Sequence, residues 1–253
     1  MKSRNYFVIT LVIAVLVVVT AVLINGFLVN KGDSNPQMSQ YNPQINAADF
    51  VSTINNTYFT LTPKTKYTYL KKTGDGTERV EVYVTEQKKN VMGVDTVVVW
   101  DRAYSNNQLI ENTYDYYAQD KSGNVWYFGE KTQELENGKV TSTSGTWEAG
   151  VDGAQPGIIM KANPQVGDNY RQEYYMGQAE DMAKIIAFNQ SVTVPFGTFI
   201  NCLNTYDYSP LEPDLKENKY YSPLIKGVVL DVDLTNGEKE ELVSIQNNTQ
   251  PSP

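Results

Sequence analysis

Apolar and polar residues alternate along most of the chain beyond residue 57, with the two-residue period of half-buried β-strands. Val80, Val82 and Val84 fall on one face of a strand predicted over Arg79–Gln87, and a turn is predicted at Lys88–Asn90. Similar strand patterns follow, separated by turn residues at intervals of about 10–15 positions. This succession predicts an antiparallel strand meander.

The most distinctive stretch is Thr113–Glu130, which predicts a β-hairpin rich in aromatic residues. Asp115 and Tyr117 share one face of its first strand, and Gly123 supplies the positive φ of a type I turn with a G1 bulge. Asn137-Gly138 is a second strong hairpin signal. The hairpin aromatics have two interpretations, a platform for a ligand or cross-strand pairs that pack the sheet, and the second is favoured.

Together these patterns predict a mainly β protein with a single antiparallel domain over residues 45–245 and some twelve strands. A curved sheet, a sandwich and a barrel all satisfy the pattern, and the chain has no fixed-period repeat. Ser144–Ile159 is dense in glycine, which predicts a long ordered loop or a sharp corner. Residues 246–253 are predicted to form a disordered tail.

The N-terminal region has a different pattern. Phe7–Ile24 is an apolar run of 18 residues, and Phe27–Val29 extends it to 23, which as a helix reaches roughly 34 Å and spans a bilayer. The best cleavage site, Val19–Ala21, is followed by more apolar residues, so an uncleaved signal-anchor is favoured over a cleaved signal peptide. Residues 1–6, 7–29 and 30–44 are therefore predicted to be a cytoplasmic tail, a transmembrane helix and a flexible stalk.

Lys2 and Arg4 precede the apolar run, which orients the chain by the positive-inside rule. The protein is then a single-pass protein of the cell membrane with its C-terminal domain outside the cytoplasm. The whole chain has 21 Lys and Arg against 29 Asp and Glu, and its net charge is −8. This acidity argues against nucleic acid as a partner.

The chain has no histidine and one cysteine, Cys202. An intramolecular disulfide is therefore impossible. Histidine-based triads, His-ligated zinc and the ordinary near-neutral proton shuttle are also excluded. No phosphate loop, dinucleotide fingerprint or serine elbow is present. The sequence predicts no cofactor and no metal site.

Three segments carry a resemblance to known proteins: DYYAQDKSGNVWYFGE, GTWEAGVDGAQPGIIM and YRQEYYMGQAEDMA. With KYYSPLIKGVVL near the C-terminus, they make the chain resemble a family of secreted or membrane-anchored prokaryotic proteins of unknown function. The resemblance implies a curved sheet and carries no activity. Leu224, Ile225 and Lys226 stand where the resemblance leads one to expect a glycine-rich turn.

The predicted function is a binding or interaction module for a small molecule, a glycan or a protein. The candidate binding residues surround the hairpin and the glycine-rich loop: Trp126, Tyr127, Trp147, Asp152 and Tyr174. Asp152 could also join oxygen ligands for calcium, although a turn aspartate is the simpler interpretation. Three Asn-x-Ser/Thr sites are glycosylation candidates, at Asn55, Asn189 and Asn247.

Two alternatives remain open. One is a structural cell-surface protein. The other is a hydrolase that acts on a surface glycan through paired carboxylates about 5–9 Å apart. No catalytic residue is assigned, and the carboxylates near the three segments are Asp115, Asp120, Glu130, Glu148, Asp152, Glu173, Glu180 and Asp181. Two carboxylates facing each other in a pocket would favour the hydrolase.

Overall fold

The computed structural model describes residues 41–74 and 76–249. Within these ranges the chain forms one 3₁₀-helix, η1 (Ala47–Asp49), followed by strands only. The first strands are β1 (Phe50–Val51), β2 (Ile54–Asn55), β3 (Thr60–Leu61), β4 (Lys66–Thr73), β5 (Gly76–Val91), β6 (Val94–Ser105), β7 (Gln108–Asp120), β8 (Val125–Glu136) and β9 (Lys139–Ser142). The others are β10 (Trp147–Glu148), β11 (Gln155–Met160), β12 (Asn169–Arg171), β13 (Glu173–Tyr174), β14 (Met182–Val194), β15 (Gly197–Tyr208), β16 (Lys216–Ser222), β17 (Gly227–Asp233) and β18 (Lys239–Gln246).

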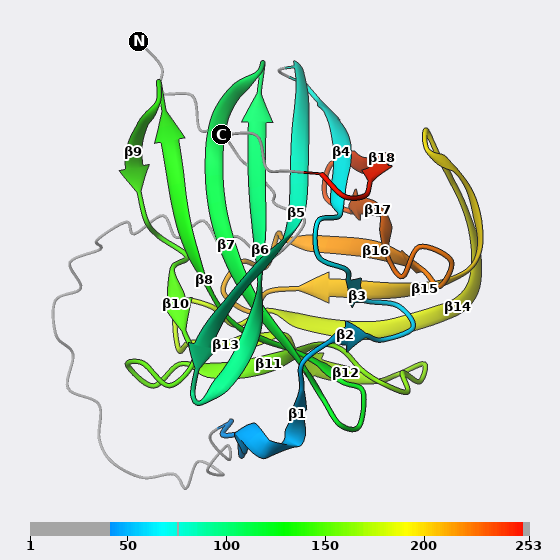
Figure 1. The fold of residues 1–253 in the computed structure, drawn as a ribbon. Coiled ribbons are helices and arrows are strands. Elements are labelled where there is room, and N and C mark those ends of the chain that lie inside the picture. The colour runs from blue at the N-terminus through cyan, green and yellow to red at the C-terminus, as the bar shows by residue number, and fades with distance from the viewer. Residues whose placement is uncertain (1–40, 75, 250–253) are drawn as a thin grey trace, which may run out of the picture.

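Thirteen of the described strands follow one another edge to edge in the order β12-β14-β15-β16-β17-β18-β4-β5-β6-β7-β8-β11-β13, and all their pairings are antiparallel. In Figure 1, β5 to β8 stand nearly upright, whereas β14 to β16 run almost horizontally. The sheet therefore curves strongly and forms a nearly closed barrel. The prediction of a mainly β, antiparallel domain is confirmed, and the barrel is the architecture adopted.

The two ends of this strand order are parts of one continuous segment. Arg171 in β12 pairs with β14, and Glu173 in β13 pairs with β11, so the segment bridges the two halves of the sheet at Gln172. Gly157 in β11 lies directly against this bridge, because a Cβ atom there would come within 2.2 Å of the Gln172 carbonyl carbon. The close approach of two backbones requires glycine at this position.

The central hairpin forms as predicted. Gly123 has φ +94°, and its N–H donates to the Asp120 carbonyl at the end of β7. Asn137 and Gly138 also make the predicted two-residue turn, with φ values of +53° and +74°. Gly129 has φ +129° and lies against the Trp147 backbone, at a register shift between β7 and β8.

The predicted turn at Lys88–Asn90 is wrong, because β5 continues to Val91. The chain reverses instead at Met92-Gly93, where both residues have positive φ and suit a tight hairpin turn. The register of β5 shifts between Val84 and Lys88, so the polar residues taken for a turn lie on a bent strand.

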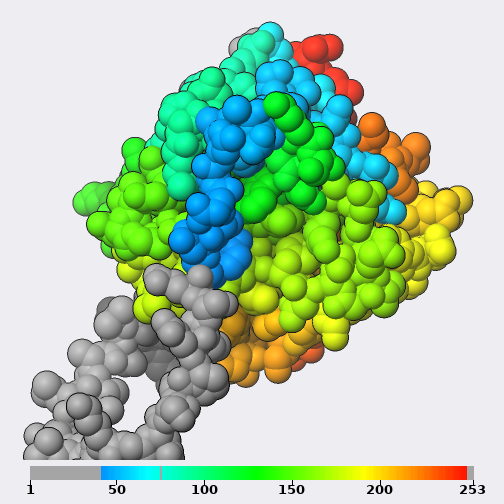
Figure 2. Space-filling model, turned by 90° about the horizontal axis from the view of Figure 1, so that it is seen from below, coloured from blue at the N-terminus to red at the C-terminus, as the bar shows by residue number. Residues whose placement is uncertain are grey.

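The N-terminal part of the described chain lies across the outside of the barrel. β1 pairs with the end of β7, and the blue segment crosses the green surface in Figure 2. The Tyr41 hydroxyl, in the last part of the predicted stalk, donates to the Pro156 carbonyl at 3.0 Å. The predicted transmembrane helix, residues 7–29, lies outside the described residues. No helix among the described residues is long and apolar enough to span a membrane.

Candidate functional site: a cavity above a belt of buried carboxylates

A cavity of about 60 Å³ lies inside one end of the barrel. Its walls come from opposite sides of the ring, from β4 to β7 on one side and β16 and β17 on the other, and the segment around β3 covers it. Most of the lining is apolar or aromatic. The lining residues are Phe59, Thr60, Leu61, Tyr67, Tyr69, Val82, Val99, Tyr117, Ile159, Gln172, Lys219, Tyr221, Lys226, Gly227 and Val228.

The cover is fixed to the barrel at two places. The Asn56 side-chain amide donates to the carbonyls of Gly123 and Lys161, at 2.9 and 3.1 Å. The Thr60 N–H donates to the Lys226 carbonyl at 2.8 Å. Between these anchors the Phe59 ring packs on Tyr117, with ring centroids 5.4 Å apart. An ordered segment therefore covers part of the cavity.

Several polar side chains line the cavity, including those of Lys219 and Lys226. The Tyr69 hydroxyl donates to the Val228 carbonyl at 3.1 Å, and the Gln172 amide donates to Asp207 at 3.4 Å. The Tyr117 hydroxyl is fully buried and has no hydrogen-bond partner in residues 41–74 and 76–249. Since a buried hydroxyl without a partner costs stability, Tyr117 is a candidate contact for a ligand.

One step deeper along the strands, the interior becomes acidic. Asp101 follows Val99 on the same face of β6, and Asp115 precedes Tyr117 on the same face of β7. Two residues of a strand span about 7 Å, so the second layer lies directly beneath the cavity. We call this layer the acidic belt, and its members are buried: Asp101, Glu111, Asp115, Glu130, Glu173, Asp181, Asp207, Glu217, Asp231 and Glu240.

The belt has a paired half. Lys219 Nζ lies 3.1, 3.5 and 3.9 Å from carboxylate oxygens of Glu217, Asp207 and Asp231. Burial alone would lower the pKa of Lys219, but these three carboxylates outweigh burial and raise it well above its usual value. Lys219 is therefore a permanent cation inside the barrel.

Four other members of the belt form no ion pair within the described part of the chain, and we call them the open half: Asp101, Asp115, Glu130 and Glu173. Both oxygens of Asp101 and of Glu173 lack a hydrogen-bond partner, as do Oδ2 of Asp115 and Oε2 of Glu130. The other oxygen of Asp115 accepts a 2.8 Å hydrogen bond from the Tyr127 hydroxyl. These are the kinds of buried polar atoms that native proteins normally satisfy.

Burial raises the pKa of each carboxyl in the open half well above its usual value, and the neighbouring carboxylates raise it further. For Asp115 the hydrogen bond from Tyr127 acts in the opposite direction. The Trp147 indole N–H lies near enough to Glu173 to lower its pKa, but the two do not form a hydrogen bond of good geometry. Both effects disfavour the charged form of these groups when no cation lies beside them.

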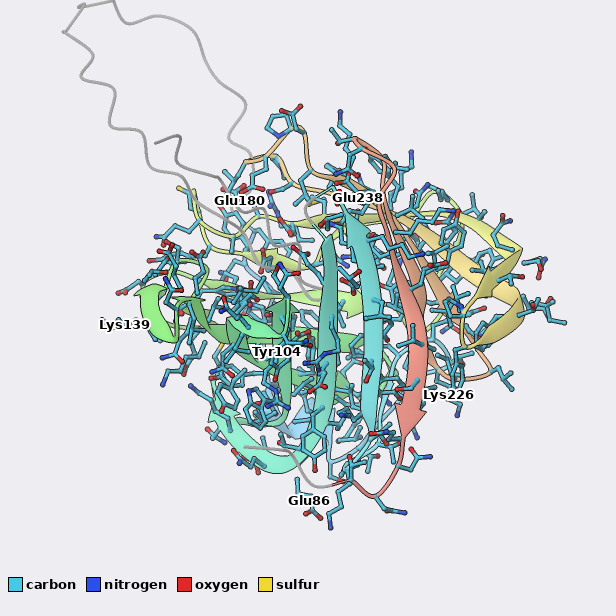
Figure 3. The ribbon with its side chains drawn as sticks, turned by 90° about the horizontal axis from the view of Figure 1, so that it is seen from above. Glu86, Tyr104, Lys139, Glu180, Lys226 and Glu238 are labelled. Atoms are coloured by element: carbon cyan, nitrogen blue, oxygen red, sulfur yellow. The ribbon has the colours of Figure 1, made fainter. Side chains whose placement is uncertain are left out.

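The two ends of the barrel interior differ in what they contain. Lys71, one step beyond Tyr69 on β4, pairs with Glu238 at 3.1 Å, whereas Lys226 lines the cavity. In Figure 3, the labelled Glu238 and Lys226 lie toward opposite ends of the pale red strand β18. The Lys71–Glu238 ion pair and the cavity therefore lie toward different ends of the barrel.

The predicted binding residues are separated by the fold. Tyr127 and Trp147 lie inside the barrel, where the Tyr127 ring stacks on Tyr117 at 4.9 Å and meets the Trp147 ring edge-on at 5.4 Å. Trp126 packs on Phe50 instead, and its indole N–H donates to Asp120.

The other two candidates are also outside the cavity. The Tyr174 ring meets the Tyr41 ring edge-on, at 5.6 Å between centroids. Asp152 is an exposed turn residue with φ +51°. None of the five predicted residues is in the cavity lining. The residues that sequence reasoning missed there include Tyr67 and Tyr69, whose alternation already places them on one face of a strand.

The three glycosylation candidates, Asn55, Asn189 and Asn247, are all exposed. Asn55 Oδ1 accepts a 2.9 Å hydrogen bond from the Gln119 amide. Within the described residues, no group of three or more Cys, Asp or Glu side chains is arranged to hold a metal ion. Cys202 is buried as a free thiol.

No protein-family model matches the chain, and no curated protein matches it. Among solved structures, the chain is similar to one described as "a putative lipoprotein from Parabacteroides distasonis ATCC 8503". The two chains are 14% identical, the match covers 75% of this chain and 98% of that chain, and the TM-score is 0.34. A TM-score of this size is too low to establish a shared fold.

Proposed function

We propose that the protein is a membrane-anchored extracytoplasmic binding module whose barrel takes a small apolar molecule, or the apolar part of a larger one, into the cavity between β4–β7 and β16–β17. The observation that carries the proposal is the cavity itself, with its aromatic walls. Ligand sites in β-barrels have this form, an apolar hollow with few polar groups that orient the ligand.

Tyr117 and Gln172 are the polar groups suited to orienting a ligand. Tyr117 contributes a free hydroxyl, and the Gln172 amide makes only one long hydrogen bond, to Asp207. The ordered cover at Phe59–Leu61 sets the size of the entrance, so ligand entry requires a displacement of this segment. The anchoring part of the proposal comes from the apolar run at residues 7–29.

The test is to fill the cavity. In the Val99→Phe variant, the larger ring occupies the space beside Tyr117, and binding of 2-phenylethanol, measured by calorimetry and saturation-transfer NMR, is expected to disappear. Thr60→Trp at the cover provides a second variant that leaves the barrel wall unchanged. Val140→Phe, at an exposed position on β9, is the matched control and retains binding. Failure of the unsubstituted protein to bind any apolar probe would contradict the proposal.

The anchor has its own test. Protease treatment of intact cells is expected to degrade residues 45–245, because the domain lies outside the membrane. Mass spectrometry of the membrane fraction is expected to find the segment 7–29 still joined to the domain. A mature chain that begins after Ala21 would contradict anchoring by this helix.

A second candidate function has one observation in its favour. Asp115 and Glu130 lie directly opposite each other on β7 and β8, so the barrel does contain facing carboxylates, as a glycan hydrolase requires. Neither is in the cavity lining, and for this reason we favour binding. Asp115→Asn and Glu130→Gln variants test the hydrolase, since each would abolish release of reducing sugar from a surface glycan that the unsubstituted protein cleaves.

A further inference from the structure

The open half of the acidic belt lies under the cavity, and Lys219 of the paired half lines the opposite wall, where three carboxylates surround it. The Tyr117 hydroxyl connects the two features. Tyr117 lines the cavity, its hydroxyl has no partner, and it is close enough to Asp115, Glu130 and Asp101 for all three to raise its pKa. A group that hydrogen-bonds to Tyr117 from the cavity therefore approaches three carboxyl groups.

We propose that the cavity and the open half together bind a small organic ammonium ion with an apolar body. The body fills the cavity, and the ammonium group lies between the Tyr117 hydroxyl and the carboxylates of Asp101 and Asp115. This inference rests on the proposed function, because it names the class of ligand that the cavity takes.

The first argument is hydrogen bonding. An ammonium group has three N–H donors and no acceptor, and the open half offers acceptors that lack a donor: both oxygens of Asp101, Oδ2 of Asp115 and Oε2 of Glu130. The Tyr117 hydroxyl can accept a further hydrogen bond. The donors of the ligand and the acceptors of the site are thus complementary.

The second argument is charge. Lys219 supplies a cation to Glu217, Asp207 and Asp231 on the opposite wall, and the same arrangement is missing around Asp101 and Asp115. Arg102 lowers the pKa of Asp101, but its guanidinium group is held by Glu81 and lies over the Trp100 ring. A bound ammonium ion would place a cation beside the carboxylates of the open half, as Lys219 does in the paired half.

The third argument is the aromatic surroundings. Tyr117 and Tyr127 stack on each other beside Asp115, and Tyr69 faces the same cavity. Cations bind to aromatic faces in sites of this kind, and the attraction increases when water is excluded. A neutral or anionic ligand would gain nothing from these rings and carboxylates beyond its apolar contacts.

The experiment compares three probes of one shape: 2-phenylethylammonium, 2-phenylethanol and phenylacetate. Binding to the full chain in nanodiscs of zwitterionic lipid is measured by calorimetry at pH 7, with empty nanodiscs subtracted. The ammonium probe is expected to bind at least about tenfold more tightly than the alcohol, as a hydrogen bond to a charged group implies, and phenylacetate is expected to bind most weakly.

Two variants locate the effect. Asp101→Asn, with Glu130→Gln as a second variant, is expected to remove the preference for the ammonium probe over the alcohol. Asp231→Asn in the paired half is the matched control and retains the preference. Equal binding of the ammonium and alcohol probes, or a preference that survives both open-half variants, would overturn the inference and leave the proposed function intact.

Calcium chloride provides a further arm. If calcium binds and excludes the ammonium probe, the open half is a metal site and the inference is overturned. If none of the three probes binds, the proposed function itself fails. The two failures therefore give different results.

Discussion

Two regions of the barrel differ in whether their charged side chains have partners. On the outer face, Glu81 accepts hydrogen bonds from Arg79 and Arg102. The two guanidinium groups lie 4.0 Å from the ring centroids of Tyr104 and Trp100. We call this set of charged residues, Arg79, Glu81 and Arg102, the outer ladder. Each of its charges has an opposite charge or an aromatic face beside it, and the set links β5 to β6.

Inside the same sheet, on the neighbouring position of β6, Asp101 is buried with no partner for either oxygen. On the next two strands, Asp115 and Glu130 each have one carboxyl oxygen without a hydrogen-bond partner among the described residues. Burying carboxyl groups without partners lowers the stability of the fold, and apolar residues of similar volume would make the barrel more stable. The contrast teaches that the outer charges stabilise the barrel, whereas the open half requires a functional explanation.

The largest expected effect comes from removing the cation of the paired half. Lys219→Met leaves the carboxylates of Asp207, Glu217 and Asp231 without their common partner, and the free energy of unfolding is expected to fall by about 3–5 kcal/mol. Urea unfolding followed by tryptophan fluorescence measures it. Lys216→Met, at an exposed site on the same strand, is the control. A loss below about 1 kcal/mol would show that the two halves do not differ.

The dependence on pH is the next largest effect. Burial and neighbouring charges raise the pKa of Asp181 to about 7 and that of Glu240 to about 8, whereas unfolding returns both groups to about 4. Between these values the folded chain holds protons that the unfolded chain has released, so stability falls as pH rises.

We therefore expect the free energy of unfolding to decrease from pH 5 to pH 8 by on the order of 2 kcal/mol. Lys219 does not oppose this trend, because its raised pKa affects stability only at pH values above its usual range. Thermal unfolding at a series of pH values measures the change. Higher stability at pH 8 than at pH 5 would contradict the burial of protonated carboxyl groups.

Asp101→Asn separates the open half from the rest of the belt. The variant cannot ionise at this position, so the loss of stability between pH 5 and pH 8 is expected to be smaller than in the unsubstituted protein by about 1 kcal/mol. The same thermal series measures the difference. Asp233→Asn, on a partly exposed residue at the end of β17, is the comparison variant. Identical pH profiles for Asp101→Asn and the unsubstituted protein would show that Asp101 does not contribute to the pH dependence of stability.

The smallest effect is expected on the outer ladder. Glu81→Gln removes the charge shared by Arg79, Arg102 and Lys66, and the free energy of unfolding is expected to fall by about 0.5–1 kcal/mol. Glu86→Gln, which affects a more exposed pair with Lys64, provides the baseline. An increase in stability with Glu81→Gln would reverse the contrast between the two faces.

The sequence predicts the strands of this barrel well because their alternation is local. Val80, Val82 and Val84 are buried as their spacing indicates, and the turn at Gly123 follows from its neighbours. The turn at Met92-Gly93 was missed because methionine at a position of positive φ carries no turn signal.

The site was harder to predict, because its residues come from strands far apart in the chain. Asp115 and Tyr117 were correctly placed on one face, but a polar residue on a strand normally indicates the solvent side, whereas this face points inward. Asp101 and Asp115 are diagonal neighbours on β6 and β7. Lys219 reaches the opposite wall only when the ring closes, which no local pattern contains. Trp126 and Tyr174 are prominent in sequence and lie elsewhere for the same reason.

The pairing of β4 with β18 has a consequence for how the protein is made. Residues 66–71 pair with residues 240–246. The first long strand, β4, therefore gains this partner only when the last strand, β18, is present. Contacts at such separation form slowly. Strands β4 to β8 can pair with each other early in folding, but their buried carboxyl groups remain in contact with water until β18 has joined β4. We therefore expect the site to assemble late in folding.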